Sequence, residues 1–327
     1  MTTSLKPIAI LGAGSWGTAL ALYLARRGQV VRLWSHESSE IEALLANREN
    51  RQFLPGHRFP DEIQPTSNLR QAILGVDDIL IAIPSAGFRQ TLILLKPVLH
   101  EKVRILCATK GIDAEKDQFL HEVINEILGE RYPASVLSGP TFAREVAAGL
   151  PAAALIAGRD HTTVMALQQR FNSPIFHIEI SDDVIGVEAG GVIKNVIAIA
   201  TGMIDGLQLG ANARAALMTR GFAEMMQIGT HLGGRPETFI GLSGLGDLIL
   251  TALDDQSRNR RLGLALGRGA SILEAEKQIG QAIEGKRNAQ LIVELASRRK
   301  LEAPLSSMIL NILQGKAEVR DLIAWLF

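Results

Sequence analysis

The stretch Gly12-Ala13-Gly14-Ser15-Trp16-Gly17 decides the fold of the N-terminal part of this chain. It follows the apolar run Ile8–Leu11, which is typical of a strand, and opens Trp16–Arg27, which has helical apolar spacing. In that context G-x-G-x-x-G is a dinucleotide fingerprint. Its glycines allow a tight turn, close approach of a pyrophosphate and close helix–strand packing, and the helix N-terminus faces the phosphates. We expect Gly12, Gly14, Ser15, Trp16 and Gly17 to bind the cofactor; a purely structural corner would not require three glycines.

The end of the second expected strand, Gln29–Trp34, bears on which cofactor is used. NAD-binding folds commonly place an acid there for the ribose 2′-hydroxyl. Here the strand runs into Ser35 and His36, and Glu37 lies beyond it, while Arg32 is nearby. A 2′-phosphate would meet no fixed negative charge, so we expect NADP or NAD, with NADP at least tolerated. His36 is assigned to cofactor binding, with a solvated loop residue as the alternative.

The first half alternates short β-branched runs with longer mixed segments, which is typical of βαβ units and a parallel sheet. Beyond Ile8–Leu11 and Gln29–Trp34, strands are expected at Asp78–Ile83, Val103–Ala108, Ser135–Ser138, Ala153–Ala157 and Pro174–Glu179, with a helix at Phe88–Leu99. The fold class is therefore α/β: an N-terminal Rossmann-type, doubly wound, mostly parallel sheet with a C-terminal all-α domain.

The second half is Ala- and Leu-rich and lacks β-branched runs bounded by turns. Helices are expected at Ala213–Leu232, Ser271–Gln281 and Asn288–Ser297. The apolar stretch Val184–Ile204 is interrupted by Glu188, Lys194 and Asn195, so we interpret it as a buried helix and not a membrane span. We expect a dinucleotide-binding domain over residues 1–183 and a helical substrate domain over 184–327.

Composition excludes several classes of protein. The 327 residues suggest about two domains with real cores, and 34 Lys and Arg balance 34 Asp and Glu. A net charge of zero provides no molecule-wide field for polyanions, so no nucleic-acid partner and no stable membrane insertion are expected. The single Cys107 lies in an expected strand, and no metal site is expected. The N-terminus shows no signal-peptide pattern, which favours a cytoplasmic location.

Several further motifs join the glycine turn. They are Ile83-Pro84-Ser85, Ala108-Thr109-Lys110-Gly111, Ser138-Gly139-Pro140-Thr141-Phe142-Ala143-Arg144-Glu145, Lys194-Asn195-Val196, Asn212-Ala213-Arg214, Gly244-Leu245-Gly246-Asp247 and Ser257-Arg258-Asn259-Arg260-Arg261. In this order, from about Ile8 to Asn288, the chain resembles the NAD(P)-dependent sn-glycerol-3-phosphate dehydrogenases. The resemblance implies a reversible hydride transfer from NAD(P)H to dihydroxyacetone phosphate, giving sn-glycerol 3-phosphate for glycerophospholipid biosynthesis. It also implies a homodimer.

The lysines make chemical sense beside that resemblance. Reduction of a ketone develops negative charge on its oxygen, so a cationic proton donor is needed. Lys194 sits in an apolar segment where an unpaired ammonium is costly, and desolvation or a second lysine would lower its pKa. A lysine snorkelling from a helix edge is the alternative. Lys110 follows an expected strand, at the sheet edge where ligands bind. By resemblance it touches substrate and cofactor, whereas the alternative is a plain surface lysine.

The resemblance assigns the remaining site residues. Asp247 is catalytic together with Lys194 and Lys110. It either orients Lys194 and binds a substrate hydroxyl, or it caps a helix, and the two roles are compatible. Thr251 lies one turn further on. Substrate contacts are Lys110, Gly139, Thr141, Lys194, Asn195, Asp247, Thr251, Ser257, Arg258 and Asn259, with Arg258 on the phosphate. Cofactor contacts beyond the glycine turn and His36 are Lys110, Ala143, Arg258, Ala282 and Glu284. Arg260 and Arg261 are expected on a solvated basic face that balances Asp254 and Asp255.

Two other functions stay open at this point. A related hydroxyacid dehydrogenase would share the Rossmann-plus-helical plan and the lysine but bind a carboxylate. A non-catalytic dinucleotide sensor would leave Lys110, Lys194, Asp247 and Arg258 without a shared purpose. Departures from the family pattern are mild, at Trp16, Thr141 and Ser243, and none removes a chemical group from the mechanism.

Overall fold

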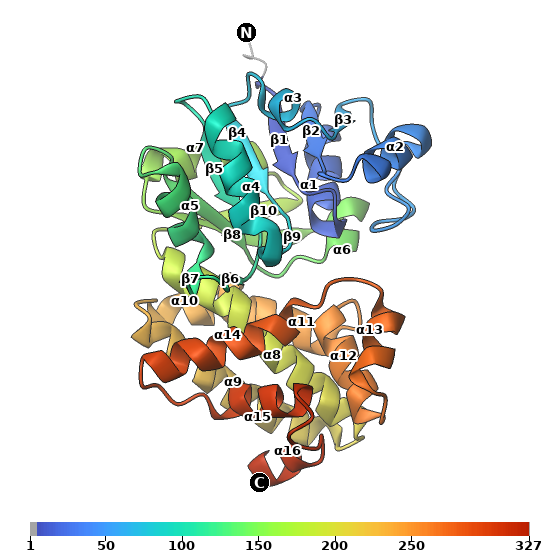
Figure 1. The fold of residues 1–327 in the computed structure, drawn as a ribbon, viewed down its shortest axis with the longest axis vertical. Coiled ribbons are helices and arrows are strands. Elements are labelled where there is room, and N and C mark those ends of the chain that lie inside the picture. The colour runs from blue at the N-terminus through green and yellow to red at the C-terminus, as the bar shows by residue number, and fades with distance from the viewer. Residues whose placement is uncertain (1–4, 327) are drawn as a thin grey trace. The chain divides into compact units, whose positions relative to one another are not determined.

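A computed structural model describes residues 5–326 as two compact units. The first contains residues up to Thr109, Leu120–Leu137 and Thr141–Val184. The second contains Lys110–Phe119, Ser138–Pro140 and the chain from Ile185 onward. Two short segments of the N-terminal half thus belong to the second unit. Figure 1 shows the strands of the first unit and the helices of the second.

The first unit is built on an eight-stranded, mostly parallel sheet in the order β10-β9-β8-β5-β4-β1-β2-β3. Its strands are β1 Ile8–Leu11, β2 Val31–Trp34, β3 Ile63–Thr66, β4 Asp78–Ile81, β5 Arg104–Cys107, β8 Ala134–Ser138, β9 Ala152–Gly158 and β10 Phe176–Ser181. β1 pairs in parallel with both β2 and β4. Chain order reverses at β1, which is the switch point where doubly wound sheets bind ligands.

Helices flank this sheet. They are α1 Ser15–Ala25, α2 Ser38–Asn47, α3 Leu69–Ile73, α4 Phe88–Leu95, α5 Leu120–Leu128, α6 Ala143–Ala148 and α7 His161–Phe171. One core cluster joins alternate strand residues, such as Ile8, Ile10 and Leu33, to α1, α2, α6 and α7. The residues between them, such as Ala9 and Leu11, are buried on the opposite face, because strand side chains alternate.

The second unit is helical apart from a small hairpin, β6 Ile112–Asp113 with β7 Gln118–Phe119. Its helices are α8 Val184–Gly206, α9 Gly210–His231, α10 Pro236–Ile240, α11 Asp247–Leu253, α12 Arg258–Gly267, α13 Ile272–Ile279, α14 Glu284–Arg298, α15 Pro304–Leu313 and α16 Asp321–Leu326. A π-helical turn, Leu242–Gly246, leads into α11. The expected fold class is confirmed.

Helix α8 forms the centre of the second unit. It is long and apolar enough to cross a membrane, but 94% of its most apolar window is buried inside the structure. Two glycines one turn apart, Gly202 and Gly206, lie against Gly263 and Gly267 of α12. A Cβ at Gly202 would lie 2.2 Å from the Arg260 carbonyl oxygen, and one at Gly263 would lie 1.9 Å from that of Ile199. The backbones of α8 and α12 therefore touch, which fixes the start of α12 relative to Lys194.

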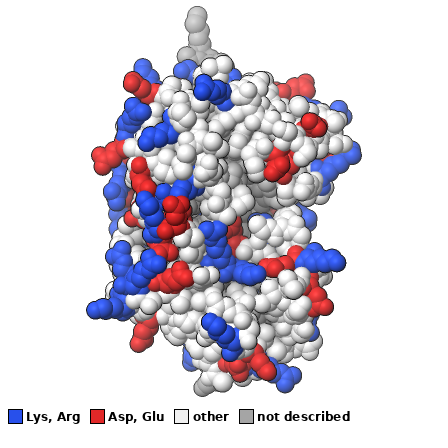
Figure 2. Space-filling model, in the orientation of Figure 1, with Lys and Arg blue, Asp and Glu red and all other residues white. Residues whose placement is uncertain are grey.

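The surface carries both signs of charge. Basic and acidic side chains are interspersed on the face in Figure 2, in keeping with the equal numbers in the sequence.

Candidate active site

In the glycine turn between β1 and α1, two glycines are needed for close packing and one leaves room for a ligand. Gly12 has φ +119°, and a Cβ there would lie 2.4 Å from the Ala82 carbonyl oxygen. A Cβ at Gly17 would lie 1.9 Å from the Gly12 carbonyl oxygen, whereas one at Gly14 would meet nothing within 4 Å. Gly12 and Gly17 are therefore required by the fold, and the second glycine leaves an open approach to the backbone.

The start of α1 suits a dinucleotide phosphate. No side chain caps the helix, and its first turn contains no acidic residue. The free N–H groups and the positive dipole end are therefore available to an anion. Ser15 donates its hydroxyl to the Phe53 carbonyl at 2.8 Å, and Trp16 packs against the core of the first unit. The residues present fit a bound NAD(P).

Arg32 in β2 and His36 just after this strand have different surroundings. The side chain of His36 is 75% exposed, and its Nε2 lies 3.1 Å from a carboxylate oxygen of Glu37. Arg32 donates instead to the carbonyls of Gln71 and Leu74, so its guanidinium is engaged by the end of α3. His36 therefore remains a candidate contact of the cofactor, while Arg32 has a structural role.

A buried charged centre lies in the second unit. Lys194, in the middle of α8, donates to Oδ1 of Asp247 at 2.8 Å and to Oγ1 of Thr251 at 2.6 Å. Lys110 donates to Oδ2 of the same carboxylate at 2.5 Å. Lys194 is 6% exposed and Asp247 2% exposed. Lys194 therefore does not snorkel to solvent, and the carboxylate of Asp247 binds lysines instead of capping α11.

Burial and neighbouring charges shift the pKa values of Lys194 and Asp247 in this centre. Burial lowers the pKa of Lys194 to about 8, with Lys110 adding to the decrease and Asp247 opposing it. Burial alone would raise the pKa of Asp247, but Lys110 and Lys194 together hold it below its usual value. A lysine with a pKa of about 8 can donate and accept a proton near neutral pH.

Two adjacent glycines of α8 allow the segments of the centre to meet. A Cβ at Gly190 would lie 2.9 Å from the Ser243 carbonyl oxygen, and one at Gly191 would lie 3.3 Å from Ser138 Oγ and 3.6 Å from the Lys110 stem. Lysine side chains on a helix lean toward its N-terminus, so Lys194 extends over this turn. Sequence reasoning missed both glycines, although a Gly-Gly pair inside a helical pattern signals close packing.

An amide network ties three helices together. Asn259, at the start of α12, donates to Oδ1 of Asn195 on α8 at 2.9 Å and accepts from the Gly285 N–H of α14 at 2.9 Å. The Asn195 amide in turn donates to the Gly191 carbonyl at 3.4 Å. These two predicted substrate residues thus hold the lysine helix, the start of α12 and the start of α14 in register.

The start of α12 combines a capped helix end with arginines. Ser257 accepts from the Arg260 N–H at 3.2 Å, and Arg258 follows it. The expectation of a solvated basic face is wrong for Arg260, which is 8% exposed. Its guanidinium donates to Asp205 of α8 at 2.5 Å and to Asp255 at 2.9 Å. Arg260 is a buried link between α8 and α12.

The other predicted residues fall in both units. Gly139, with φ +142°, belongs to the second unit, as do exposed Ala282 and Glu284, the first residue of α14. Thr141 and Ala143 belong to the first unit, where Ala143 begins α6. Within residues 5–326, no group of three or more His, Cys, Asp or Glu residues could hold a metal ion.

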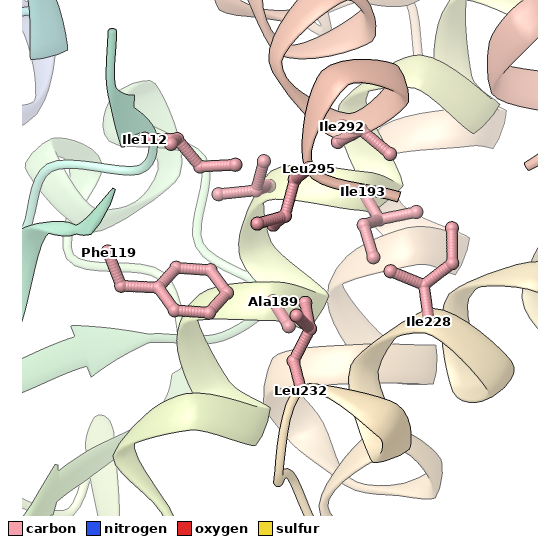
Figure 3. Close-up of a pocket in the computed structure, with 9 residues that line it drawn as sticks. Ile112, Phe119, Ala189, Ile193, Ile228, Leu232, Ile292 and Leu295 are labelled. Carbon is pink, nitrogen blue, oxygen red and sulfur yellow. The ribbon is translucent and has the colours of Figure 1, made fainter. Parts of the chain in front are cut away.

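A small apolar crevice lies beside α8 in the second unit (Figure 3). Phe119 and Ile112 of the hairpin face residues of three helices there. The full lining is Ile112, Phe119, Ala189, Val192, Ile193, Ile228, Leu232, Ile292 and Leu295. It offers no hydrogen-bonding side chain, so it is unsuited to a polar phosphate ester.

The sheet, the glycine turn and the Lys110–Asp247–Lys194 centre together define a dinucleotide-dependent oxidoreductase with a helical C-terminal region. Comparison with known proteins narrows this class. Residues 7–164 match the family model described as NAD-dependent glycerol-3-phosphate dehydrogenase N-terminus, and residues 183–324 match its C-terminus. The chain belongs to the NAD-dependent glycerol-3-phosphate dehydrogenase family, as the motifs led us to expect.

Individual relatives agree with this membership. The chain is 47% identical over 322 residues to glycerol-3-phosphate dehydrogenase [NAD(P)+] of Edwardsiella ictaluri, covering 98% of this chain and 95% of that protein. Its identity to the Yersinia pestis (strain Pestoides F) enzyme of the same name is also 47%, with the same coverage. A crystal structure of glycerol-3-phosphate dehydrogenase from Coxiella burnetii superposes with a TM-score of 0.96 at 46% identity and covers 99% of both chains.

Proposed function

We propose that this protein is an NAD(P)-dependent glycerol-3-phosphate dehydrogenase that acts mainly as a dihydroxyacetone phosphate reductase and supplies sn-glycerol 3-phosphate for glycerophospholipid synthesis. The observation that carries the proposal is the buried Lys110–Asp247–Lys194 centre in a chain of this family. A structural ion pair would not require a second lysine on the same buried carboxylate, since each buried charge carries a desolvation cost.

Lys194 is the proton donor in the reducing direction. Two of its three N–H bonds are directed at Asp247 and Thr251, which leaves one for the oxygen of the reacting carbon. As negative charge develops on that oxygen, the ammonium stabilises it and transfers a proton. In the oxidising direction neutral Lys194 accepts a proton from the glycerol 3-phosphate hydroxyl. Its pKa of about 8 places both states within reach of neutral pH.

Asp247 and Lys110 support this transfer. Asp247 holds both ammonium groups by opposite oxygens, so it fixes their separation and offsets their repulsion. Lys110 adds to the lowering of the Lys194 pKa by burial, and it adds a second positive charge near the reacting oxygen. Thr251 restrains the direction of the Lys194 side chain. Gly139 and Thr141 are assigned to the substrate by the resemblance.

The substrate phosphate is assigned to the start of α12. Arg258 provides a forked donor, and Ser257 and Asn259 flank it. The remaining contacts are assigned to the cofactor: the glycine turn with Ser15 and Trp16, then His36, Ala143, Ala282 and Glu284, with Lys110 and Arg258 shared with the substrate. Glu284 suits a ribose hydroxyl. When bound, NAD(P)H supplies the hydride.

We also propose a cytoplasmic homodimer. The resemblance implies a dimer, and Ile249 and Leu253, one turn apart on α11, are 44% and 47% exposed. Light scattering on the purified protein tests the dimer: a mass of one chain at micromolar concentration contradicts it.

A spectrophotometric assay tests the function. Folded protein should oxidise NADH or NADPH when dihydroxyacetone phosphate is added, and the two cofactors compared side by side establish the preference. Turnover with a 2-keto acid in place of the phosphate ester would favour the hydroxyacid dehydrogenase alternative. Cofactor binding without turnover on either substrate would favour a dinucleotide sensor.

A further inference from the structure

Two arginines at the start of α12 differ from the third in their surroundings. Arg258 and Arg261 are three residues apart, so they lie on the same side of the helix. Arg260 between them is held by two aspartates and a carbonyl. Over residues 5–326, neither Arg258 nor Arg261 has a hydrogen-bond or ion-pair partner, and Nε of Arg261 is buried without one.

This arrangement is costly in the absence of an anion. Both side chains are partly buried. Burial lowers the pKa of Arg258, Glu284 opposes that effect, and the charge of Arg261 adds to the lowering. Two guanidinium groups that repel each other, with the buried Nε of Arg261 left unsatisfied, destabilise the protein unless a ligand binds them. Arginine forks match the oxygens of a phosphate group in a bidentate manner.

The charge of the pair fits the same kind of ligand. Arg258 and Arg261 place two positive charges at the start of α12, and Glu284 offsets part of this charge at Arg258. A phosphate monoester carries about −1.5 to −2 at pH 7, so it can pair with both guanidinium groups, whereas a monoanion such as a carboxylate offers a single charge.

We propose that Arg261 is a second phosphate-binding residue, acting with Arg258, and that the pair selects a dianionic phosphate ester over a monoanionic substrate. This inference rests on the proposed function and assigns Arg261 a role in its substrate specificity. It replaces the sequence-based expectation that Arg261 lies on a solvated basic face.

The experiment compares Arg261→Met and Arg261→Lys with a matched control, Arg268→Met, which removes one positive charge from an exposed position at the other end of α12. For Arg261→Met we expect KM for dihydroxyacetone phosphate to rise roughly 10- to 100-fold with a smaller change in kcat, because a charge-assisted hydrogen bond is lost. Arg261→Lys should fall between wild type and Met, because it keeps the charge without the fork. Arg268→Met should match wild type.

Two further measurements isolate the phosphate. Inorganic phosphate should raise the melting temperature of wild type and Arg268→Met, and it should raise that of Arg261→Met much less. With dihydroxyacetone, which has no phosphate, wild type and Arg261→Met should differ by less than about threefold. The melting curve of Arg261→Met without phosphate shows whether the variant is folded. The shift of that curve on adding phosphate measures binding and does not depend on turnover.

The outcomes separate this inference from the proposed function. If wild type reduces dihydroxyacetone phosphate and Arg261→Met has the same KM and phosphate response, the inference is wrong while the function stands. A rise in KM for NAD(P)H alone would place Arg261 on the cofactor and also overturn it. If wild type does not reduce dihydroxyacetone phosphate, but phosphate raises its melting temperature and does not raise that of Arg261→Met, the proposed function is wrong and the anion site stands.

Discussion

Lys194 is paired with Asp247 at 2.8 Å, and both side chains are almost completely removed from solvent. A buried pair is strongly destabilised when one partner loses its charge, because the other ammonium or carboxylate is left uncompensated. Here Asp247 carries a second lysine on its other oxygen, so its removal would leave two uncompensated ammonium groups.

Replacing Asp247 with Asn keeps the size of the side chain and removes its charge. The pKa of Lys194 should then fall further below 8, because burial and Lys110 lower it and only Asp247 raises it. Lys194 becomes largely neutral at pH 7 and cannot donate a proton. We expect kcat for reduction to fall about 10²- to 10⁴-fold, with NADPH binding retained. Unchanged kcat in a folded Asp247→Asn protein would remove Asp247 from this role.

The pH dependence of the wild type should differ between the two directions. Reduction needs the protonated form of Lys194, so its kcat should be constant well below pH 8 and decline as pH rises through about 8. Oxidation of glycerol 3-phosphate needs the neutral form, so its kcat should rise over the same range. Lys194→Met should lose turnover, about 10²-fold or more, while a fluorescence titration still detects NADPH binding. A pH midpoint shared by wild type and Lys194→Met would contradict the assignment.

Replacing two glycines of the first unit with alanine should have different effects, one on stability and one on cofactor binding. Gly17→Ala places a Cβ 1.9 Å from the Gly12 carbonyl, so it should lower the melting temperature through a backbone shift. Gly14→Ala meets no atom within 4 Å and has φ −71°, which alanine adopts without strain. It should fold as stably as wild type and bind NADPH at least tenfold more weakly, because the methyl group occupies the pyrophosphate approach. Equal cofactor affinity in wild type and Gly14→Ala would place the pyrophosphate elsewhere.

The elements that depend on local pattern were predictable from sequence. Ile8–Leu11 and the glycine turn form as expected, and Lys194 lies in a buried helix. No strand is predicted at β3, which contains Pro65, a residue that central strands rarely accommodate. It lies at the edge of the sheet, beside β2 alone, where a proline is tolerated.

Other features depend on contacts between distant residues, and no local pattern reports them. Arg260 pairs with Asp205, 55 residues away, so a charge run that resembles a solvated face is buried. Lys110 follows a strand of the first unit but belongs, with the β6–β7 hairpin, to the second. The motifs supplied the identities of the charged residues, whereas their pairing became visible only in three dimensions.

Glu224 provides a test of stability away from the charged centre. It lies on α9, and its carboxylate accepts from the backbone N–H groups of Leu305 and Ser306 at 2.6 and 3.0 Å and from the Ser306 hydroxyl at 2.6 Å. It thereby caps α15, whose own N-cap, Ala303, has no side-chain acceptor. Glu224→Ala leaves buried donors unsatisfied and should lower the free energy of unfolding by about 1–3 kcal/mol.

The cost of Glu224→Ala should also depend on pH. Burial raises the pKa of Glu224, and the three hydrogen bonds oppose this only in part. A raised carboxyl pKa means that the stabilisation is fully present below the ordinary carboxyl value and decreases as pH rises through the raised one. In melting curves recorded at pH 4.5 and 7.5, the difference in melting temperature between wild type and Glu224→Ala should therefore be larger at pH 4.5. Ser306→Ala, which removes one donor and keeps the backbone cap, should cost less than Glu224→Ala at both. A gap that widens with pH would mean that the folded protein favours the ionised carboxylate.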